Sequence, residues 1–166
     1  MKKVILGLAI VAAAFSVNAQ SKEAAPAKKI SFGGGASIGI PVGDFGPFAS
    51  LAYGADVQAE YAAAESFGVT LSAGYLSFVG KSGITISGGF IPVLLGGRYY
   101  FSPKVYGSAQ AGMSFSTNSG GGSAFTFAPG VGYKVSENLD LLVKYQSATK
   151  NGSDNSFVGL RVGYKF

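Results

Sequence analysis

The 166-residue sequence contains no cysteine and no histidine. Without cysteine the chain has neither a disulfide nor a thiol nucleophile, and without histidine it lacks the usual general base and a common transition-metal ligand. We therefore expect no enzyme activity, no catalytic residue, no cofactor and no metal site. The stability of an exported chain of this kind must come from packing or from a lipid solvent.

Charged residues are scarce as well. They make up 13% of the chain, and 26 residues are glycine. Ordinary soluble domains contain about 25% charged residues, so this chain is poorly equipped to keep a water-facing exterior soluble. The formal net charge of +5 is mild, and no concentrated basic face is apparent, which argues against nucleic acid as a partner.

The first 29 residues have the pattern of an export signal followed by a linker. A basic start, MKK, precedes an apolar run over residues 4–17 that is too short to span a membrane comfortably. Small residues, VNA, supply a cleavage-like site before Gln20. We predict a signal peptide over residues 1–19, with an N-terminal membrane anchor as the alternative. A periplasmic linker over residues 20–29 and one domain over residues 30–166 follow.

From Ile30 to the end, apolar residues alternate with small or polar ones. In the last stretch, for example, Val158 and Leu160 alternate with Gly159 and Arg161. A period of two residues is that of a β-strand whose two faces meet different surroundings. The pattern occurs in eight segments, residues 30–40, 51–61, 67–75, 91–101, 105–115, 125–135, 139–147 and 156–166.

The connections between these segments alternate in length. The short ones are residues 62–66, 102–104 and 136–138, and the longer, polar ones are residues 41–50, 76–89, 116–123 and 149–155. A tilted strand of about ten residues crosses a bilayer, and short turns at one end with longer loops at the other are typical of outer-membrane barrels. The sequence therefore predicts an all-β, eight-stranded, antiparallel up-and-down transmembrane β-barrel.

The two faces of the predicted strands differ in chemistry. One is rich in Leu, Val, Ile and Tyr, and the other is mostly Gly, Ser and Ala, which suits the narrow lumen of an eight-stranded barrel. Because a basic residue on the lipid face costs about 2–4 kcal/mol at mid-membrane, charges should keep to the lumen. The predicted lumenal charge network is Asp56, Glu60, Arg98, Lys134, Asp140, Lys144 and Arg161.

Aromatic residues of the apolar face gather near the two ends of the strands, which predicts girdles at the two membrane interfaces. Two prolines disturb the pattern. Pro92 and Pro129 fall inside predicted strands, where each removes a donor from the hydrogen-bond ladder. We expect a local β-bulge at Pro129, since bulges and rims are where a closed barrel tolerates such a loss.

Five stretches, VNAQ, GIPVGDFG, IPVLLGGRYYF, APGVGYKVSENLDLLVKYQ and FVGLRVGYKF, carry a resemblance to a known family. On these the chain resembles the small eight-stranded outer-membrane proteins of the OmpA/OmpX type, and more closely the single-domain outer membrane beta-barrel or small porin-family proteins of Bacteroidota. The resemblance implies a monomer in the Gram-negative outer membrane with both termini periplasmic. It implies contact with membrane lipid and with the outer-membrane insertion machinery, for which Tyr164 and Phe166 resemble the C-terminal signal of the barrel-closing strand.

Three functions remain open from the residues. The leading hypothesis is a non-enzymatic integral outer-membrane barrel with a side-chain-filled lumen and a structural or surface-contact role in the cell envelope. In the second, the same lumenal charges line a minor pore for small solutes or ions. The third is a soluble periplasmic ligand-binding barrel, which hides its apolar face inside.

Overall fold

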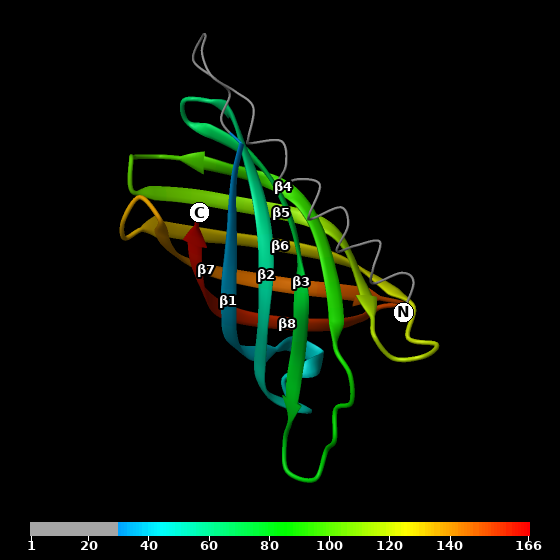
Figure 1. The fold of residues 1–166 in the computed structure, drawn as a ribbon. Helices are drawn as coiled ribbons and strands as arrows, with labels where there is room; N and C mark the ends of the chain where they lie inside the picture. The colour runs from blue at the N-terminus through cyan, green and yellow to red at the C-terminus, as the bar shows by residue number, and fades with distance from the viewer. Residues whose placement is uncertain (1–29) are drawn as a thin grey trace.

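The computed structural model describes residues 30–166, which form a closed antiparallel barrel of eight strands (Figure 1). The predicted signal peptide and linker lie outside the described residues. Each strand pairs with its neighbour in sequence, and the last pairs with the first, which confirms the predicted fold class. The strands are β1 Ile30–Val42, β2 Ala49–Ala64, β3 Phe67–Gly80, β4 Phe90–Tyr100, β5 Val105–Ser116, β6 Ser123–Lys134, β7 Leu139–Lys150 and β8 Ser153–Lys165.

A short 3-10 helix, η2 (Gly43–Phe45), lies between β1 and β2. Across residues 30–166, no helix is long and apolar enough to cross a membrane.

The C-terminal strand closes the barrel. Gly33 of β1 lies opposite Lys165 of β8, and the pairing continues to Val42 and Ser156 in one register. Beyond the strand, the backbone N–H of Phe166 donates to the carbonyl oxygen of Phe32 (2.9 Å). Chain ends usually fray unless they are held in a sheet. Here the patterned C-terminal stretch is paired on both sides, so the barrel has no free edge.

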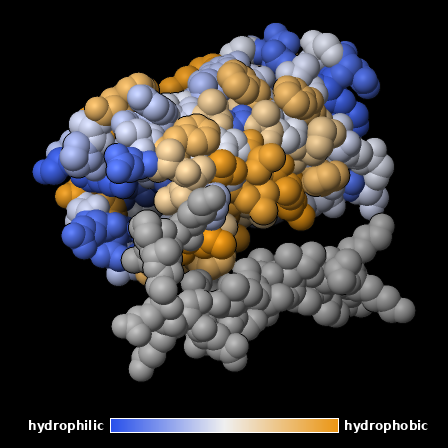
Figure 2. Space-filling view, turned by 90° about the horizontal axis from the view of Figure 1, so that it is seen from above, coloured by the Kyte–Doolittle hydropathy of each residue, from blue (hydrophilic) through white to orange (hydrophobic). Residues whose placement is uncertain are grey.

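The outer wall of the barrel is apolar. Mid-strand residues such as Leu95, Val131 and Val143 point outward and are more than half exposed. Figure 2 shows hydrophobic side chains across the middle of the visible face, with hydrophilic ones gathered toward its two ends. This band of exposed Leu, Ile, Val and aromatic residues is what a wall solvated by hydrocarbon requires.

The connections divide the barrel into a short-turn end and a long-loop end, and one of them differs from its prediction. The expected loop over residues 149–155 is a two-residue turn at Asn151 (φ 53°) and Gly152 (φ 84°). Positive φ at both positions is the geometry of a type I′ hairpin, which Asn-Gly favours. The loop prediction was wrong because it rested on the polarity of residues 149–155. The Asn151-Gly152 pair, which favours a tight hairpin turn, is the feature that decides the structure here. The three longer connections are residues 43–48, 81–89 and 117–122.

The expectation of a bulge at Pro129 is also wrong. The pairing of β6 with β7 skips Ala128 and Pro129 but resumes at Gly130 in the same register. The pairing of β3 with β4 skips Pro92 in the same manner. At each proline the pairing is therefore interrupted over two residue pairs, and the flanking pairs keep the register. The register shifts that do occur lie at the two ends of the β2–β3 pairing.

We predict that Leu95→Arg lowers the free energy of unfolding by about 2–4 kcal/mol, because it places a charge on the lipid face at the middle of β4. Val135→Arg, also exposed but at the short-turn rim, should cost at most about 1 kcal/mol. Urea unfolding of the protein in phospholipid vesicles measures both. Equal losses at the two positions would contradict a hydrocarbon-facing mid-wall.

Candidate functional site

The lumen is the part of the molecule where polar side chains from distant parts of the sequence meet. All seven residues of the predicted charge network lie on the inner face, between the middle of the barrel and its short-turn end. Alternation along each strand sets this face, since successive side chains point to opposite sides of a sheet. The seven come from β2 (Asp56, Glu60), β4 (Arg98), β6 (Lys134), β7 (Asp140, Lys144) and β8 (Arg161).

Arg161 and Asp56 form a two-pronged ion pair that crosses the inner surface of β1. The guanidinium donates from Nε to Oδ1 (2.9 Å) and from Nη2 to Oδ2 (2.7 Å). It lies directly over Gly35 of β1, where a Cβ would come within 2.5 Å of Arg161 Cζ. Arg161 is only 4% exposed. A bidentate, charge-assisted contact of this kind is strong, and a glycine beneath it leaves the room it needs.

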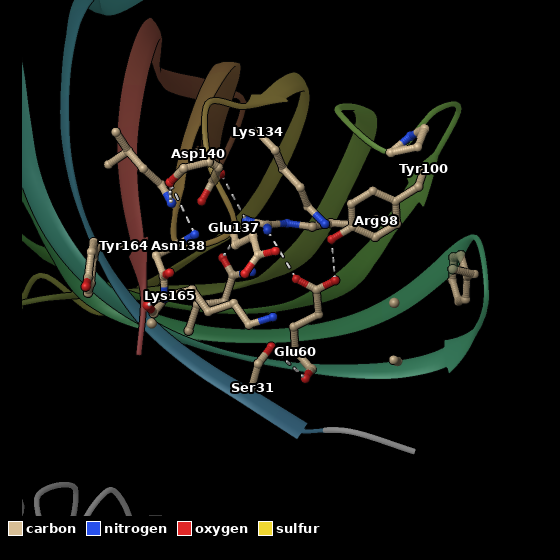
Figure 3. Close-up of a pocket in the computed structure, with 18 of the residues that line it drawn as sticks. Ser31, Glu60, Arg98, Tyr100, Lys134, Glu137, Asn138, Asp140, Tyr164 and Lys165 are labelled. Atoms are coloured by element: carbon tan, nitrogen blue, oxygen red, sulfur yellow. Dashed lines mark hydrogen bonds and ion pairs between the residues drawn. The ribbon is translucent and has the colours of Figure 1, made fainter. Parts of the chain in front are cut away.

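Arg98 is held between two carboxylates (Figure 3). Its Nη1 donates to Glu60 Oε2 (3.1 Å), and its Nη2 lies 3.7 Å from Asp140 Oδ2. Each carboxylate also accepts a tyrosine hydroxyl, Tyr100 on Glu60 (2.6 Å) and Tyr106 on Asp140. The guanidinium stacks on the Tyr106 ring, 4.6 Å from its centroid. Buried charges are tolerated when they are paired and hydrogen-bonded in this way.

Asp140 joins the two arginine clusters into one network. Its Oδ1 lies 3.9 Å from Arg161 Nη1, while its Oδ2 faces Arg98. The structure thus brings five of the seven predicted residues into one ion-pair network. The two tyrosines of this network were not among the predicted site residues. The alternation could have indicated them, because it places Tyr100 and Tyr106 on the inner face, which otherwise consists mostly of Gly, Ser and Ala.

Two predicted residues, Lys134 and Lys144, lie outside the ion pairs. The ammonium of Lys134 sits 4.1 Å from the centroid of the Tyr100 ring. That of Lys144 donates to Gln146 Oε1 (3.1 Å) and lies 5.7 Å from the Phe157 ring. Among residues 30–166, neither lysine has a carboxylate oxygen within 4 Å. The lumen therefore holds more positive charge than its own carboxylates neutralise.

A group of phenylalanine rings packs at the long-loop end of the lumen, where the inner face also carries buried polar residues such as Ser114 and Thr126. Phe45 of η2 packs edge-on against Phe78 of β3 (4.9 Å between centroids), and Phe78 packs against Phe90 and Phe157 (6.2 and 6.3 Å). We call these four rings the aromatic cluster. Phe157 is 1% exposed. The sequence did not predict this cluster, because Phe78 falls in a segment that was assigned to a loop.

The short-turn end of the lumen is a cavity of about 680 Å³. We call it the vestibule, and Figure 3 shows charged side chains from several strands pointing into it. Both arginines of the network line it. No cluster of three or more potential metal ligands occurs in the part of the chain that the structure describes. Other vestibule residues include Ser31, Lys134, Lys165 and the carboxylates Glu60, Glu65, Glu137 and Asp140.

The two residues of the predicted insertion signal lie on the outer face at the short-turn end. Tyr164 and Phe166 are both more than half exposed, and their ring centroids are 6.0 Å apart. They are therefore available to a partner at the membrane interface, where aromatic rings are favoured. Their role in barrel insertion stays a prediction.

An eight-stranded barrel with an apolar wall and ion pairs inside has the architecture of transmembrane β-barrel proteins. Residues 7–166 match the model of a family described as the outer membrane protein beta-barrel domain, so the chain belongs to this family. Family membership supports an integral protein of the bacterial outer membrane. The prediction that the chain is not an enzyme agrees with it.

Solved structures agree with this family assignment at the level of fold. A de novo designed transmembrane β-barrel has a TM-score of 0.56 at 21% identity, covering 87% of this chain and 100% of its own. The attachment invasion locus protein Ail of Yersinia pestis has a TM-score of 0.54 at 17% identity, covering 82% and 97%.

The N-terminal β-barrel domain of Pseudomonas aeruginosa OprF has a TM-score of 0.52 at 17% identity, with the same coverage of 82% and 97%. No curated protein matches the sequence.

We predict that Arg161→Met lowers the free energy of unfolding by about 3–5 kcal/mol, because it leaves the Asp56 carboxylate buried without its partner. Combining it with Asp56→Leu should restore most of the loss, since no uncompensated charge remains. Urea unfolding in vesicles measures both variants, with Lys104→Met on an exposed turn as control. A double variant as unstable as the single one would show that the pair is not the interaction that matters.

Proposed function

We propose that this protein is an integral outer-membrane barrel with a side-chain-filled lumen, which serves the cell envelope as a structural element or through contacts of its loops. The observation that supports the proposal is that two groups of side chains fill the lumen one after the other along the barrel axis. The ion-pair network crosses its middle, with Arg98 and Arg161 both buried, and the aromatic cluster occupies its long-loop end.

The chemistry of the two barriers supports a closed lumen. An ion that passes through a pore needs polar groups or water to replace its hydration shell at every step. The network offers such groups, but its carboxylates are engaged with arginine and tyrosine donors. The aromatic cluster offers none, because it consists of phenylalanine rings packed with Leu76 and Ile86. The buried hydroxyl groups of Ser114 and Thr126 lie at the same end, and they are hydrogen-bonded to each other (2.6 Å).

A minor pore is the second candidate function, and the vestibule is the observation that favours it. A polar cavity of about 680 Å³ already occupies one end of the lumen, so only the long-loop half would need to open. The soluble-barrel alternative is not supported, because the apolar face of the sheet points outward and the family is one of outer-membrane proteins.

We further propose an orientation and a set of partners. Ile30 and Phe166 both lie at the short-turn end, since β1 begins there and β8 ends there. We assign this end to the periplasm and the longer loops to the cell exterior, as in outer-membrane barrels generally. The partners are then membrane lipid and the insertion machinery, and the protein is a monomer that binds no nucleic acid.

In planar lipid bilayers the purified protein should give no steady conductance, because the side chains of the ion-pair network and of the aromatic cluster fill the lumen. Heat-modifiable migration on a gel verifies that the inserted protein is folded. A steady conductance that disappears in Arg98→Gln or Glu60→Gln, but persists in the turn variant Lys104→Gln, would contradict the filled lumen and establish the pore.

The absence of native cysteine allows the orientation to be tested with single cysteines. In intact cells, Ser119→Cys in the loop over residues 117–122 should react with a membrane-impermeant maleimide. Lys104→Cys, in the turn between β4 and β5, should react only after the outer membrane is permeabilised. The opposite labelling pattern would reverse the proposed orientation while leaving the barrel itself intact.

A further inference from the structure

The register of the closed barrel allows heights to be compared between strands. A row of paired residues that begins at Phe32 on β1 passes through all eight strands and returns to β1 at Val42, ten residues further toward the long-loop end. The row therefore climbs by about 1.25 residues at each strand, which is the stagger that barrel closure requires. One residue of a strand tilted by about 40° rises about 2.5 Å along the barrel axis.

The outer face of the last hairpin becomes polar before it reaches the rim. Its outward residues nearest the turn, which we call the polar notch, are Ser147, Thr149, Asp154 and Ser156. On the strands to either side, Ile40 of β1 and Phe125 of β6 lie within about one residue of the height of Ser147. Both point outward and are 69% and 56% exposed. The last apolar residues of the hairpin, Tyr145 and Val158, lie about 3–7 Å lower than these two.

The side chains of the polar notch bond one another and leave two groups over. The hydroxyl of Tyr145 donates to Ser156 Oγ (3.1 Å), and the hydroxyl of Ser156 donates to Ser147 Oγ (2.9 Å). The hydroxyl of Thr149 donates to Asp154 Oδ1 (2.6 Å). Among residues 30–166, the Ser147 hydroxyl has no acceptor of its own, and no Lys or Arg nitrogen lies within 4 Å of Asp154.

These two groups define what the notch needs from its surroundings. An ionised carboxylate without a partner is costly to place in hydrocarbon, and an unmade hydroxyl bond adds to that cost. The residues at the same height on β1 and β6 are apolar, as hydrocarbon requires. The boundary between hydrocarbon and polar headgroups must therefore lie lower over the last hairpin than over the strands beside it.

We propose that the polar notch holds the headgroup of a zwitterionic phospholipid from the leaflet at the long-loop end. The phosphate oxygens accept from the Ser147 hydroxyl, and the ammonium lies against the Asp154 carboxylate. The acyl chains then run down the wall over Tyr145 and Val158. A bilayer accommodates a locally shorter apolar surface by thinning at modest cost. The site goes beyond the structural role proposed above and requires only that the barrel be inserted in a bilayer.

Nitroxide labels on single cysteines measure the depth of this boundary, since the chain has no native cysteine. Ser147→Cys, Ile40→Cys and Phe125→Cys are compared in vesicles of phosphatidylethanolamine and phosphatidylcholine. Because water is excluded from the hydrocarbon, collisions with a water-soluble nickel complex, relative to collisions with oxygen, should be at least about twofold more frequent at Ser147→Cys than at either neighbour. Leu95→Cys, at the middle of the wall, gives the hydrocarbon reference, and heat-modifiable migration verifies folding.

Filling the notch tests its cause. The double change Thr149→Val, Asp154→Leu continues the apolar face toward the rim, so the label at Ser147→Cys should then give the same ratio as the label at Ile40→Cys. An unchanged ratio would overturn the proposal, because the notch residues would not set the boundary.

Two further results would also overturn it. Equal ratios at Ser147→Cys, Ile40→Cys and Phe125→Cys would mean that the apolar belt has an even edge. A label at Ser147→Cys that neither reagent reaches would indicate a second protein molecule over the notch in place of lipid. Because Leu95→Cys reports insertion separately, neither result would be confused with failure of the barrel to enter the bilayer.

Discussion

The hydrocarbon around the barrel is the constraint from which the rest of the structure follows. Without water at mid-membrane, backbone N–H and C=O groups must find partners within the protein, and a sheet meets this demand only by closing on itself. Pairing of β8 with β1 is therefore a necessity of the environment. Closure with eight strands leaves a lumen little wider than its side chains, so charges excluded from the wall are forced close together.

Glycine residues on the inner face leave the space that these charged side chains occupy. A Cβ at Gly35 would collide with the guanidinium of Arg161, and one at Gly68 would come within 2.5 Å of Glu60 Oε1. The same holds at Gly163, between Arg161 and Asp140. Large ionised side chains can thus lie flat across neighbouring strands. The high glycine content and the ion-pair network are two aspects of one solution to a narrow interior.

The two-residue period was sufficient to predict the strands, their inward and outward faces and the residues of the lumen, because alternation is a local property. The pairs within the lumen were not predictable in this way. Arg161 meets Asp56, 105 positions away, only because closure sets the stagger between β8 and β2. The aromatic cluster was not predicted either. Phe78 belongs to the last part of β3, where the sequence shows no clear two-residue alternation. At Pro129 a local feature led to a wrong prediction. Proline suggested a bulge, but the pairs on either side of it hold β6 and β7 in one register.

The Asn151-Gly152 hairpin makes the long-loop rim uneven. Loops over residues 43–48, 81–89 and 117–122 rise above the strands on one side, whereas β7 and β8 end almost flush with their tight turn. The connections at this end are consequently long between the strands from β1 to β6 and short between β7 and β8. A macromolecule approaching along the barrel axis would contact the three longer loops before it reached the hairpin between β7 and β8.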